Sequence, residues 1–237
     1  MLIHQKELEE KIIEANRLYR EGNPIMSDKE YDSMKEGLEK YFPDSDILKK
    51  AIVEESVKGD RMERLPFPMF SLEKVKTVDE IVRWVKDVWG LSPNDRVVIT
   101  PKYDGISLLV DETTNDCWTR GDGTEGQNSR DHYRYVNHGN PMNKKGCFTF
   151  GEAIIPIGMF LKNVKPLGYK SARNAVAGAF NADDFNAQVL GNTAYVRYGI
   201  MDSDRDKSMQ LAELRNDYGN YATQYWVTSA GVFDDNK

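Results

Sequence analysis

The apolar residues change their spacing near residue 90, which restricts the fold to a mixed architecture. Before this point, Leu8, Ile12, Ala15 and Tyr19 recur at helical spacing until the Gly-Asn-Pro turn at residues 22–24. After it, β-branched or aromatic runs bounded by Gly, Asn and Asp follow at residues 96–100, 106–111, 117–120, 148–155 and 193–201. Short strands with tight connections favour antiparallel sheet over βαβ units. We therefore predict an α+β fold, in which a small helical module precedes a mainly antiparallel-sheet domain.

Two capping boxes mark where helices begin. Ser27 precedes Glu30 by three residues, and Thr77 stands in the same relation to Glu80. In such a box the hydroxyl accepts from an early helix amide while the glutamate reaches back to the cap. The first box opens a helix at Asp28, and the second opens one that ends at Gly90. Two more helices are predicted, at residues 171–180 and 209–215.

The segment from Leu65 to Pro68 predicts an extended connection between two domains. Its two prolines forbid helix for themselves and disfavour it in the residue before each of them. We place the domain boundary just before this segment, giving a helical module at residues 1–62 and a sheet domain at residues 63–237.

Composition excludes several classes of protein. No apolar run is long enough to cross a bilayer, and acidic residues stand where a signal peptide would need an apolar stretch. The two cysteines, Cys117 and Cys147, have neither a disulfide framework nor metal-ligand spacing. The net charge of −6 argues against a free-standing DNA binder, because duplex affinity rests largely on cations that meet phosphates. These features predict a soluble cytoplasmic protein with no membrane partner.

A lysine between two predicted strands is the first candidate for chemistry. Lys102 lies in Pro101-Lys102-Tyr103-Asp104-Gly105. An exposed lysine in a hairpin turn explains this motif by itself. The alternative is a lysine nucleophile, which reacts only when unprotonated and so needs cations or apolar walls beside it. In that interpretation Gly105 lets a phosphate approach the backbone.

Three further residues are candidates for binding a nucleotide. Arg120 ends a strand that pairs back toward the lysine loop, where a guanidinium can bind phosphate or ribose. Glu152 stands in an otherwise apolar run, where a carboxylate needs hydroxyls, a cation or a metal. Tyr198 lies in an aromatic strand that could wall a base, although such strands are more often core.

Several motifs in one order make a family resemblance specific. Lys102-Tyr103-Asp104-Gly105 resembles the active-site motif of the covalent nucleotidyltransferases, which are DNA ligases, RNA ligases and capping enzymes. The chain resembles the NAD⁺-dependent DNA ligases over nearly its whole length, less so beyond about residue 200. The other motifs that carry this resemblance are Pro68-Met69-Phe70-Ser71-Leu72, Thr119-Arg120-Gly121-Asp122-Gly123-Thr124, Gly151-Glu152 and Ala172-Arg173-Asn174-Ala175-Val176-Ala177-Gly178.

The N-terminal module resembles the part of these ligases that recognises the nicotinamide mononucleotide half of NAD⁺. Tyr19, Asp28, Tyr31 and Asp32 match its tyrosine-and-aspartate motif, while Arg20 replaces a histidine. Asp28, Tyr31 and Asp32 share one helix face by their spacing. A ring for stacking and carboxylates for a cationic pyridinium and for ribose hydroxyls suit this leaving group. An acidic, solvated helix start is the plainer explanation for the aspartates alone.

The resemblance implies an adenylation-type nucleotidyltransferase domain and a role for each matched residue. Lys102 would attack the adenylyl phosphorus of NAD⁺ and release nicotinamide mononucleotide, with Mg²⁺ and basic groups offsetting the negative charge. Asp104 would orient the lysine or help to bind the metal. Arg120 and Glu152 would hold phosphate and ribose, and Ser71, Leu72 and Arg173 would line the nucleotide or DNA side. The AMP would then activate the 5′-phosphate of a nick in double-stranded DNA.

The chain departs from the family pattern at several positions. Thr100 stands where a glutamate usually reads adenine, and Phe150 and Asn181 replace basic residues that are usual beside DNA. Neither the Asp-Gly-Val-Val-x-Lys motif nor the later lysine motif follows residue 200. The sheet domain is therefore expected to be C-terminally truncated. A second subunit, as in the split ligases of some large bacteriophages, would supply these motifs and the OB-fold and helix-hairpin-helix regions.

Three alternatives to a natural ligase subunit are compatible with the same residues. The chain could be a fragment of a longer ligase. It could be a catalytically silent NAD⁺-binding or regulatory subunit, an alternative that the threonine at position 100 and the absence of the later lysine motifs leave open. It could also be an ATP-dependent RNA ligase or capping-type transferase, against which the N-terminal module argues.

Overall fold

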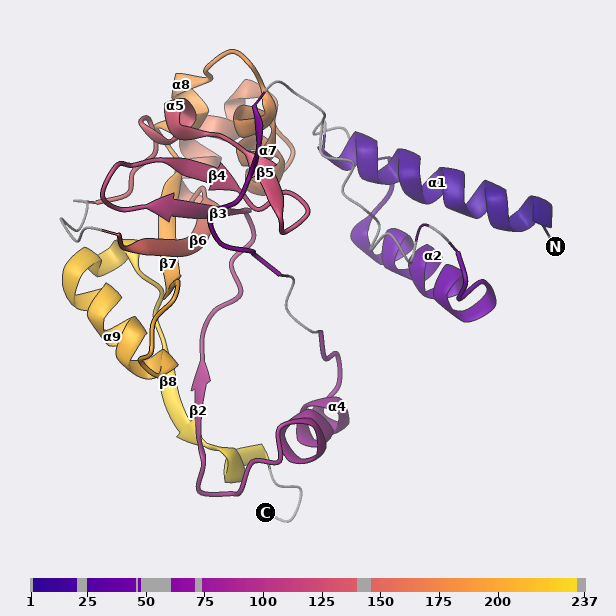
Figure 1. The fold of residues 1–237 in the computed structure, drawn as a ribbon. Helices are drawn as coiled ribbons and strands as arrows, with labels where there is room; N and C mark the ends of the chain where they lie inside the picture. The colour runs from indigo at the N-terminus through magenta and orange to yellow at the C-terminus, as the bar shows by residue number, and fades with distance from the viewer. Residues whose placement is uncertain are drawn as a thin grey trace.

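The computed structural model describes residues 2–20, 25–45, 47, 61–70, 74–139 and 146–233. It shows a helical pair, a four-stranded sheet covered by helices, and a two-stranded ribbon that extends away from the sheet (Figure 1). The fold is α+β with only antiparallel pairs between its strands, as the sequence predicts.

Two helices form the N-terminal module, α1 (Leu2–Arg20) and α2 (Asp28–Tyr41). The predicted capping box of α2 is confirmed, since the Ser27 hydroxyl accepts from the Glu30 amide and the Glu30 carboxylate accepts from the Ser27 amide at 2.8 Å. Ile12 and Leu38 are fully buried between the helices. The Ser45 hydroxyl beyond α2 donates to Glu9 of α1 at 2.6 Å, which fixes the second helix against the first.

The main sheet has the strand order β4-β3-β6-β7. Alternation along β3 and β6 sends Leu108 and Ala153 to one face and Ser107 and Glu152 to the other. Four of the predicted strands are confirmed within two residues at each end, and they form this sheet: β3 (Ile106–Asp111), β4 (Cys117–Thr119), β6 (Phe148–Ile154) and β7 (Ala194–Ile200).

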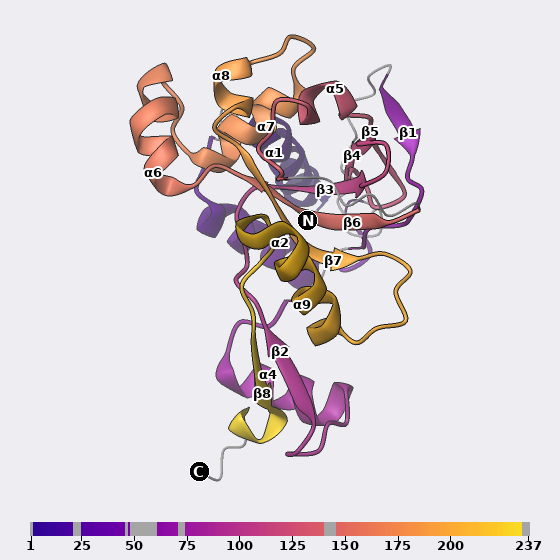
Figure 2. The ribbon, with the colours of Figure 1, turned by 90° about the vertical axis from the view of Figure 1, so that its left-hand side faces the viewer.

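One face of this sheet carries the main core, and short helices cover it (Figure 2). Val176 and Phe180 of α7 and Val164 of η2 are fully buried there against the strands. The Ser171 hydroxyl caps α7 by accepting from the Asn174 amide at 3.1 Å. The helical segments of this layer are α5 (Arg130–Tyr133), α6 (Ile157–Met159), η2 (Phe160–Val164), η3 (Lys165–Leu167), α7 (Ala172–Asn181) and α8 (Ala187–Leu190).

The opposite face carries Ser107, Glu152 and Tyr198, and we call it the site face. A smaller apolar cluster covers part of it, where Leu65 and Met69 pack against Leu109 of β3. The predicted connection at residues 65–68 is therefore not a free linker, because Leu65 is buried on the sheet and Phe67 packs against the same cluster. Amides of Leu65 and Met69 also donate to the carbonyls of Thr124 and Gly123, at 2.9 and 2.8 Å.

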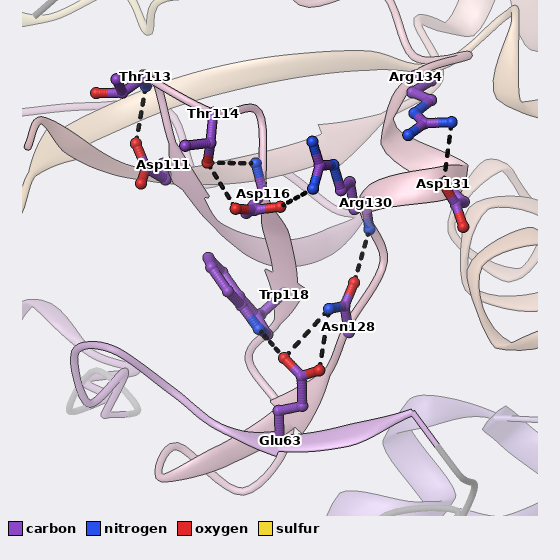
Figure 3. Close-up of polar contacts among 10 residues, drawn as sticks. All are labelled: Glu63, Asp111, Thr113, Thr114, Asp116, Trp118, Asn128, Arg130, Asp131 and Arg134. Carbon is purple, nitrogen blue, oxygen red and sulfur yellow. Dashed lines mark hydrogen bonds and ion pairs between the residues drawn. The ribbon is translucent and has the colours of Figure 1, made fainter. Parts of the chain in front are cut away.

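Two short strands hold this covering segment in place, β1 (Met62–Arg64) and β5 (Glu125–Gln127). Glu63 of β1 accepts from the Trp118 indole at 2.8 Å and from the Asn128 side chain at 3.1 Å (Figure 3). Sequence reasoning predicted neither strand, because three-residue strands carry too short an alternation to recognise. The proposed division between residues 62 and 63 falls inside β1 and stays a prediction.

The ribbon pairs β2 (Arg96–Ile99) with β8 (Trp226–Ser229). Helix α9 (Lys207–Tyr218) joins the ribbon to the main sheet, because its buried Leu211 and Leu214 pack against Ile200 of β7 and Val98 of β2. The remaining segments are α4 (Val78–Arg83), which follows the confirmed Thr77 capping box, η1 (Trp84–Val88), η4 (Gly219–Tyr221) and η5 (Ala230–Phe233).

Candidate active site

The lysine loop connects the ribbon to the main sheet between β2 and β3, and Lys102 is exposed within it. Gly105 closes the loop and is buried. A Cβ on Gly105 would lie 2.0 Å from the carbonyl oxygen of Ala153, so the glycine allows two backbones to approach closely. From the sequence we suggested that Gly105 lets a phosphate approach the backbone. The structure gives a different reason for a glycine here, which is close packing of the loop against β6.

Glu152 is the central carboxylate of the site face. The Ser107 hydroxyl donates to it at 2.9 Å and the Tyr198 hydroxyl at 3.4 Å. Burial raises the pKa of Glu152, while the Ser107 hydrogen bond and the charges of Arg173 and Lys102 act to lower it. Two hydroxyls of the protein itself therefore donate to this carboxylate, and the charges of two basic residues act on it.

Basic side chains approach Glu152 from two further elements. Arg173, in the first turn of α7, donates to Asp104 of the lysine loop at 3.0 Å. This ion pair is half exposed and so contributes little to stability, but it holds the loop beside the helix. The structure thus brings Lys102, Asp104, Glu152 and Arg173 into one cluster.

Arg120 reaches the same face from the end of β4. Its amide donates to the Ser107 carbonyl at 3.0 Å, and its charge acts on Tyr198. The turn after it needs left-handed backbone, which Gly121 supplies at φ +55° and Gly123 at φ +99°. The predicted Asp-Gly hairpin thus places Arg120 at the edge of the cluster.

Tyr198 lies between the polar cluster and an aromatic patch. Burial and the neighbouring Glu152 charge raise its pKa to about 12, so the phenol remains a hydrogen-bond donor. Its ring meets Phe150 edge-on, with centroids 5.2 Å apart. Tyr195 of the same strand is fully buried on the other face, as a plain core residue would be.

Two rows of side chains therefore cross the site face. The polar row contains Arg120, Ser107 and Glu152, from β4, β3 and β6. The apolar row contains Trp118, Leu109 and Phe150, from the same strands. The polar row offers groups for hydroxyls and phosphates. The apolar row is packed against Leu65 and Met69 of the covering segment.

Comparison with known proteins identifies related chains. The chain is 35% identical over 222 residues to a DNA ligase of Acanthamoeba polyphaga mimivirus, covering 90% of this chain and 33% of that protein. It is 31% identical over 201 residues to DNA ligase 1 of Nocardia farcinica, covering 76% of this chain and 28% of that protein. The chain is related to DNA ligases.

The alignments cover only part of each ligase. The chain spans about a third of the length of the two curated relatives just named. A third ligase, from Desulfatibacillum aliphaticivorans, is 30% identical over 177 residues, which are 72% of this chain and 27% of that protein. No family model matches the chain.

The other residues that the ligase resemblance singles out lie elsewhere along the chain or outside its described part. Thr100 is exposed just after β2. Tyr31 and Asp32 lie on α2. The hydrogen bond and the charge of Glu36 raise the pKa of Lys76, and the charge of Asp32 adds to this effect. Outside the described residues or side chains lie Tyr19, Arg20, Asp28, Ser71 and Leu72.

The described residues contain no group of three or more acidic, histidine or cysteine side chains that could hold a metal. One carboxylate oxygen of Asp104 accepts a hydrogen bond from Arg173, and Asp104 lies in an exposed loop. In the described part of the chain, no helix is long and apolar enough to cross a membrane.

Sequence reasoning missed one member of the cluster, Ser107. Its signal was available, since Ser107 is the one polar residue between Ile106 and Val110 of a strand that follows the Lys-x-Asp-Gly motif. Alternation would have placed it on the face opposite Leu108. Its pairing with Glu152 depends on the strand register and could not be read from the sequence.

Proposed function

We propose that the chain carries the self-adenylylation site of an NAD⁺-dependent DNA ligase, with Lys102 as the nucleophile. The observation that carries this proposal is that Lys102 shares one cluster with Glu152 and Arg173, although the three residues are far apart in the sequence. The relationship to proteins named DNA ligase supports the same activity.

In the proposed step, the unprotonated Lys102 amine forms a bond to the adenylyl phosphorus of NAD⁺. The bond between that phosphorus and the bridging oxygen breaks, and nicotinamide mononucleotide leaves with the bonding electrons. The amine's remaining extra proton passes to solvent, which leaves AMP joined to the lysine as a phosphoramide. Arg120 and Arg173 would offset charge on the phosphoryl oxygens, and Mg²⁺ would supply further positive charge there.

Glu152 is proposed to bind the ribose. A partly buried carboxylate that already accepts from two hydroxyls has acceptor capacity for the hydroxyls of a sugar. The ring of Tyr198 would support the base. On α2, the face with Tyr31 and Asp32 would meet the nicotinamide mononucleotide half, together with Tyr19, Arg20 and Asp28. Ser71, Leu72 and Thr100 are proposed to line the nucleotide side.

The decisive experiment is intact-mass measurement after incubation with NAD⁺ or with ATP. Addition of one AMP from NAD⁺ only, located at Lys102 by peptide mapping and lost in Lys102→Ala, is the expected result. Lys162→Ala is the matched control, because Lys162 is an exposed lysine on η2, in the helical layer that covers the other face. Addition from ATP alone would favour a capping-type or RNA-ligase activity. No addition from either would favour a silent NAD⁺-binding subunit.

Nick sealing is a separate proposal. The curated relatives are about three times longer than the part that this chain matches, so sealing of nicked double-stranded DNA would draw on regions beyond those aligned. We propose that a second polypeptide supplies them. A labelled nicked duplex, incubated with the adenylylated chain with and without a candidate partner, tests this. Sealing by the chain alone would contradict the need for a partner.

A further inference from the structure

The helical layer carries an exposed apolar patch on the segment from α6 to η3, at residues 157–167, which Figure 2 shows at the outer edge of the layer. Two of its aliphatic side chains, Ile157 and Leu161, are 70% and 53% exposed. They stand four residues apart and so share one side of the helical turns. Met159 and Leu167 are exposed as well. We call these four residues the η2 patch.

The same segment is apolar on its inward side. Phe160 and Val164 are buried in the main core, and they too stand four residues apart. Asn163 fixes the segment to α8 and the turn after it, because its side chain donates to Asn192 at 2.7 Å and its carbonyl accepts from Gln188 at 3.4 Å. A helical segment that is apolar on two sides is typical of a buried helix. The η2 patch is therefore an exposed surface on an anchored element that lacks the polar outer side of an ordinary surface helix.

Basic side chains border the η2 patch, and no acid of the same stretch balances them. Residues 153–182 contain no Asp or Glu, whereas Lys162, Lys165 and Lys170 are all exposed there. Among the described residues, no carboxylate forms an ion pair with these lysines. Lys165 follows Leu161 by four residues, so a positive charge continues the aliphatic stripe. The surface combines aliphatic anchors with positive charge, although the net charge of the chain is −6.

We infer that the η2 patch is a docking surface for an acidic amphipathic helix of a partner protein. Apolar side chains of that helix would pack against Ile157 and Leu161, and its carboxylates would meet Lys162 and Lys165. The charge complementarity and the two-sided apolar segment both require such a partner. The inference does not depend on the proposed function, because the patch lies in the helical layer, which covers the sheet face opposite the site face.

Two other kinds of partner fit the η2 patch less well. A DNA duplex offers phosphates to the lysines but little apolar surface to the aliphatic pair, and protein–DNA interfaces are more polar than those between proteins. A lipid surface is disfavoured because no aromatic ring is exposed in residues 157–167, and such rings are typical of membrane interfaces.

Calorimetric titration of the whole chain with two synthetic helical peptides tests the inference. The acidic peptide carries leucines four residues apart with glutamates and alanines elsewhere, and the basic peptide has lysines in place of the glutamates. The wild-type protein should bind the acidic peptide at least about tenfold more tightly than the basic one, and added salt should weaken this binding. In Ile157→Ser with Leu161→Ser, the affinity for the acidic peptide should fall about tenfold or more. In Lys162→Glu with Lys165→Glu, the preference should reverse toward the basic peptide.

A matched control and two further probes accompany these titrations. Val78→Ser replaces an aliphatic residue that is 68% exposed on α4, outside the helical layer, and should bind the acidic peptide as wild type does. Far-UV circular dichroism of each variant should match that of wild type, because the replaced side chains are exposed. Absence of binding to the acidic peptide, equal binding of both peptides, or an unchanged affinity in the aliphatic double variant would overturn the inference. So would tighter binding of an unnicked DNA duplex or of phosphatidylglycerol vesicles that is lost in the lysine double variant.

Discussion

Tyr198 and Glu152 lie on neighbouring strands, and the tyrosine hydroxyl donates to the carboxylate at 3.4 Å. The tyrosine pKa of about 12 keeps this donor protonated, while burial raises the pKa of the carboxyl group itself. The fold therefore keeps a carboxylate in a place where its ionised form is disfavoured. Such a cost is typical of groups that are kept for binding or catalysis.

Replacing this carboxylate should stabilise the fold at neutral pH while removing ribose binding. A carboxyl whose folded pKa is raised contributes stability that is present below its unfolded value, near 4.5, and lost as pH rises through the folded value. The glutamine in Glu152→Gln does not ionise, so this variant does not lose stability at position 152 as pH rises. Its free energy of unfolding should therefore exceed that of wild type more at pH 7 than at pH 4, while AMP affinity falls at least tenfold. Urea titrations at the two pH values and calorimetry with AMP measure both effects; equal stability differences at both pH values would contradict the expected linkage.

The glycine of the lysine loop should tolerate no side chain. In Gly105→Ala the new Cβ would meet the Ala153 carbonyl oxygen at 2.0 Å, so one of two backbones must move. We expect a loss of about 2 kcal/mol or more in the free energy of unfolding, together with loss of AMP transfer to Lys102. Gly37→Ala is the control, because nothing lies within 4 Å of its added Cβ and it sits inside α2, where alanine favours helix. A Gly105→Ala protein as stable and active as wild type would show that the loop is not held against β6.

The sequence predicted the local elements well and the long-range arrangement less well. The capping boxes at Ser27 and Thr77 and the ends of β3 depend on residues close in sequence, so their signals are complete within a short window. The partnership of Ser107 with Glu152 and the position of Lys207 over Phe150 depend on register and on how α9 packs. Those contacts arise from tertiary structure, so no local sequence pattern predicts them.

A buried ion pair beneath the site should be essential for folding. Arg197 of β7 donates to Glu112 at 2.6 and 3.0 Å, and neither side chain is exposed to solvent. The Thr149 hydroxyl also donates to this carboxylate, at 2.5 Å, and the guanidinium lies 3.6 Å from the centre of the Tyr218 ring. Arg197→Met would leave the carboxylate buried without its partner, at a cost of about 3–5 kcal/mol.

The control for this pair is an ion pair at the surface. Arg130 and Asp116 are 3.0 Å apart, and both side chains are partly exposed (Figure 3). Arg130→Gln should cost less than about 1 kcal/mol, because solvent screens such a pair. Urea unfolding followed by circular dichroism compares the two variants. A similar loss in the free energy of unfolding for both variants would mean that burial does not make the Arg197 pair more important for stability than the surface pair.

The anchor of the β1 segment should control both stability and the position of the residues that follow it. Glu63 accepts from Trp118 and Asn128, and it holds β1 against β4 and β5 (Figure 3). Removing its carboxylate in Glu63→Ala leaves the indole N–H without this acceptor, which should cost about 1–2 kcal/mol. Because Leu65 and Met69 pack on the site face just beyond β1, the variant should also bind AMP more weakly. Tryptophan fluorescence of the folded protein should change, and Glu63→Gln, which keeps an acceptor oxygen for the indole, should restore most of the stability. If Glu63→Ala unfolds more easily but binds AMP as wild type does, the covering segment stabilises the sheet without positioning the site.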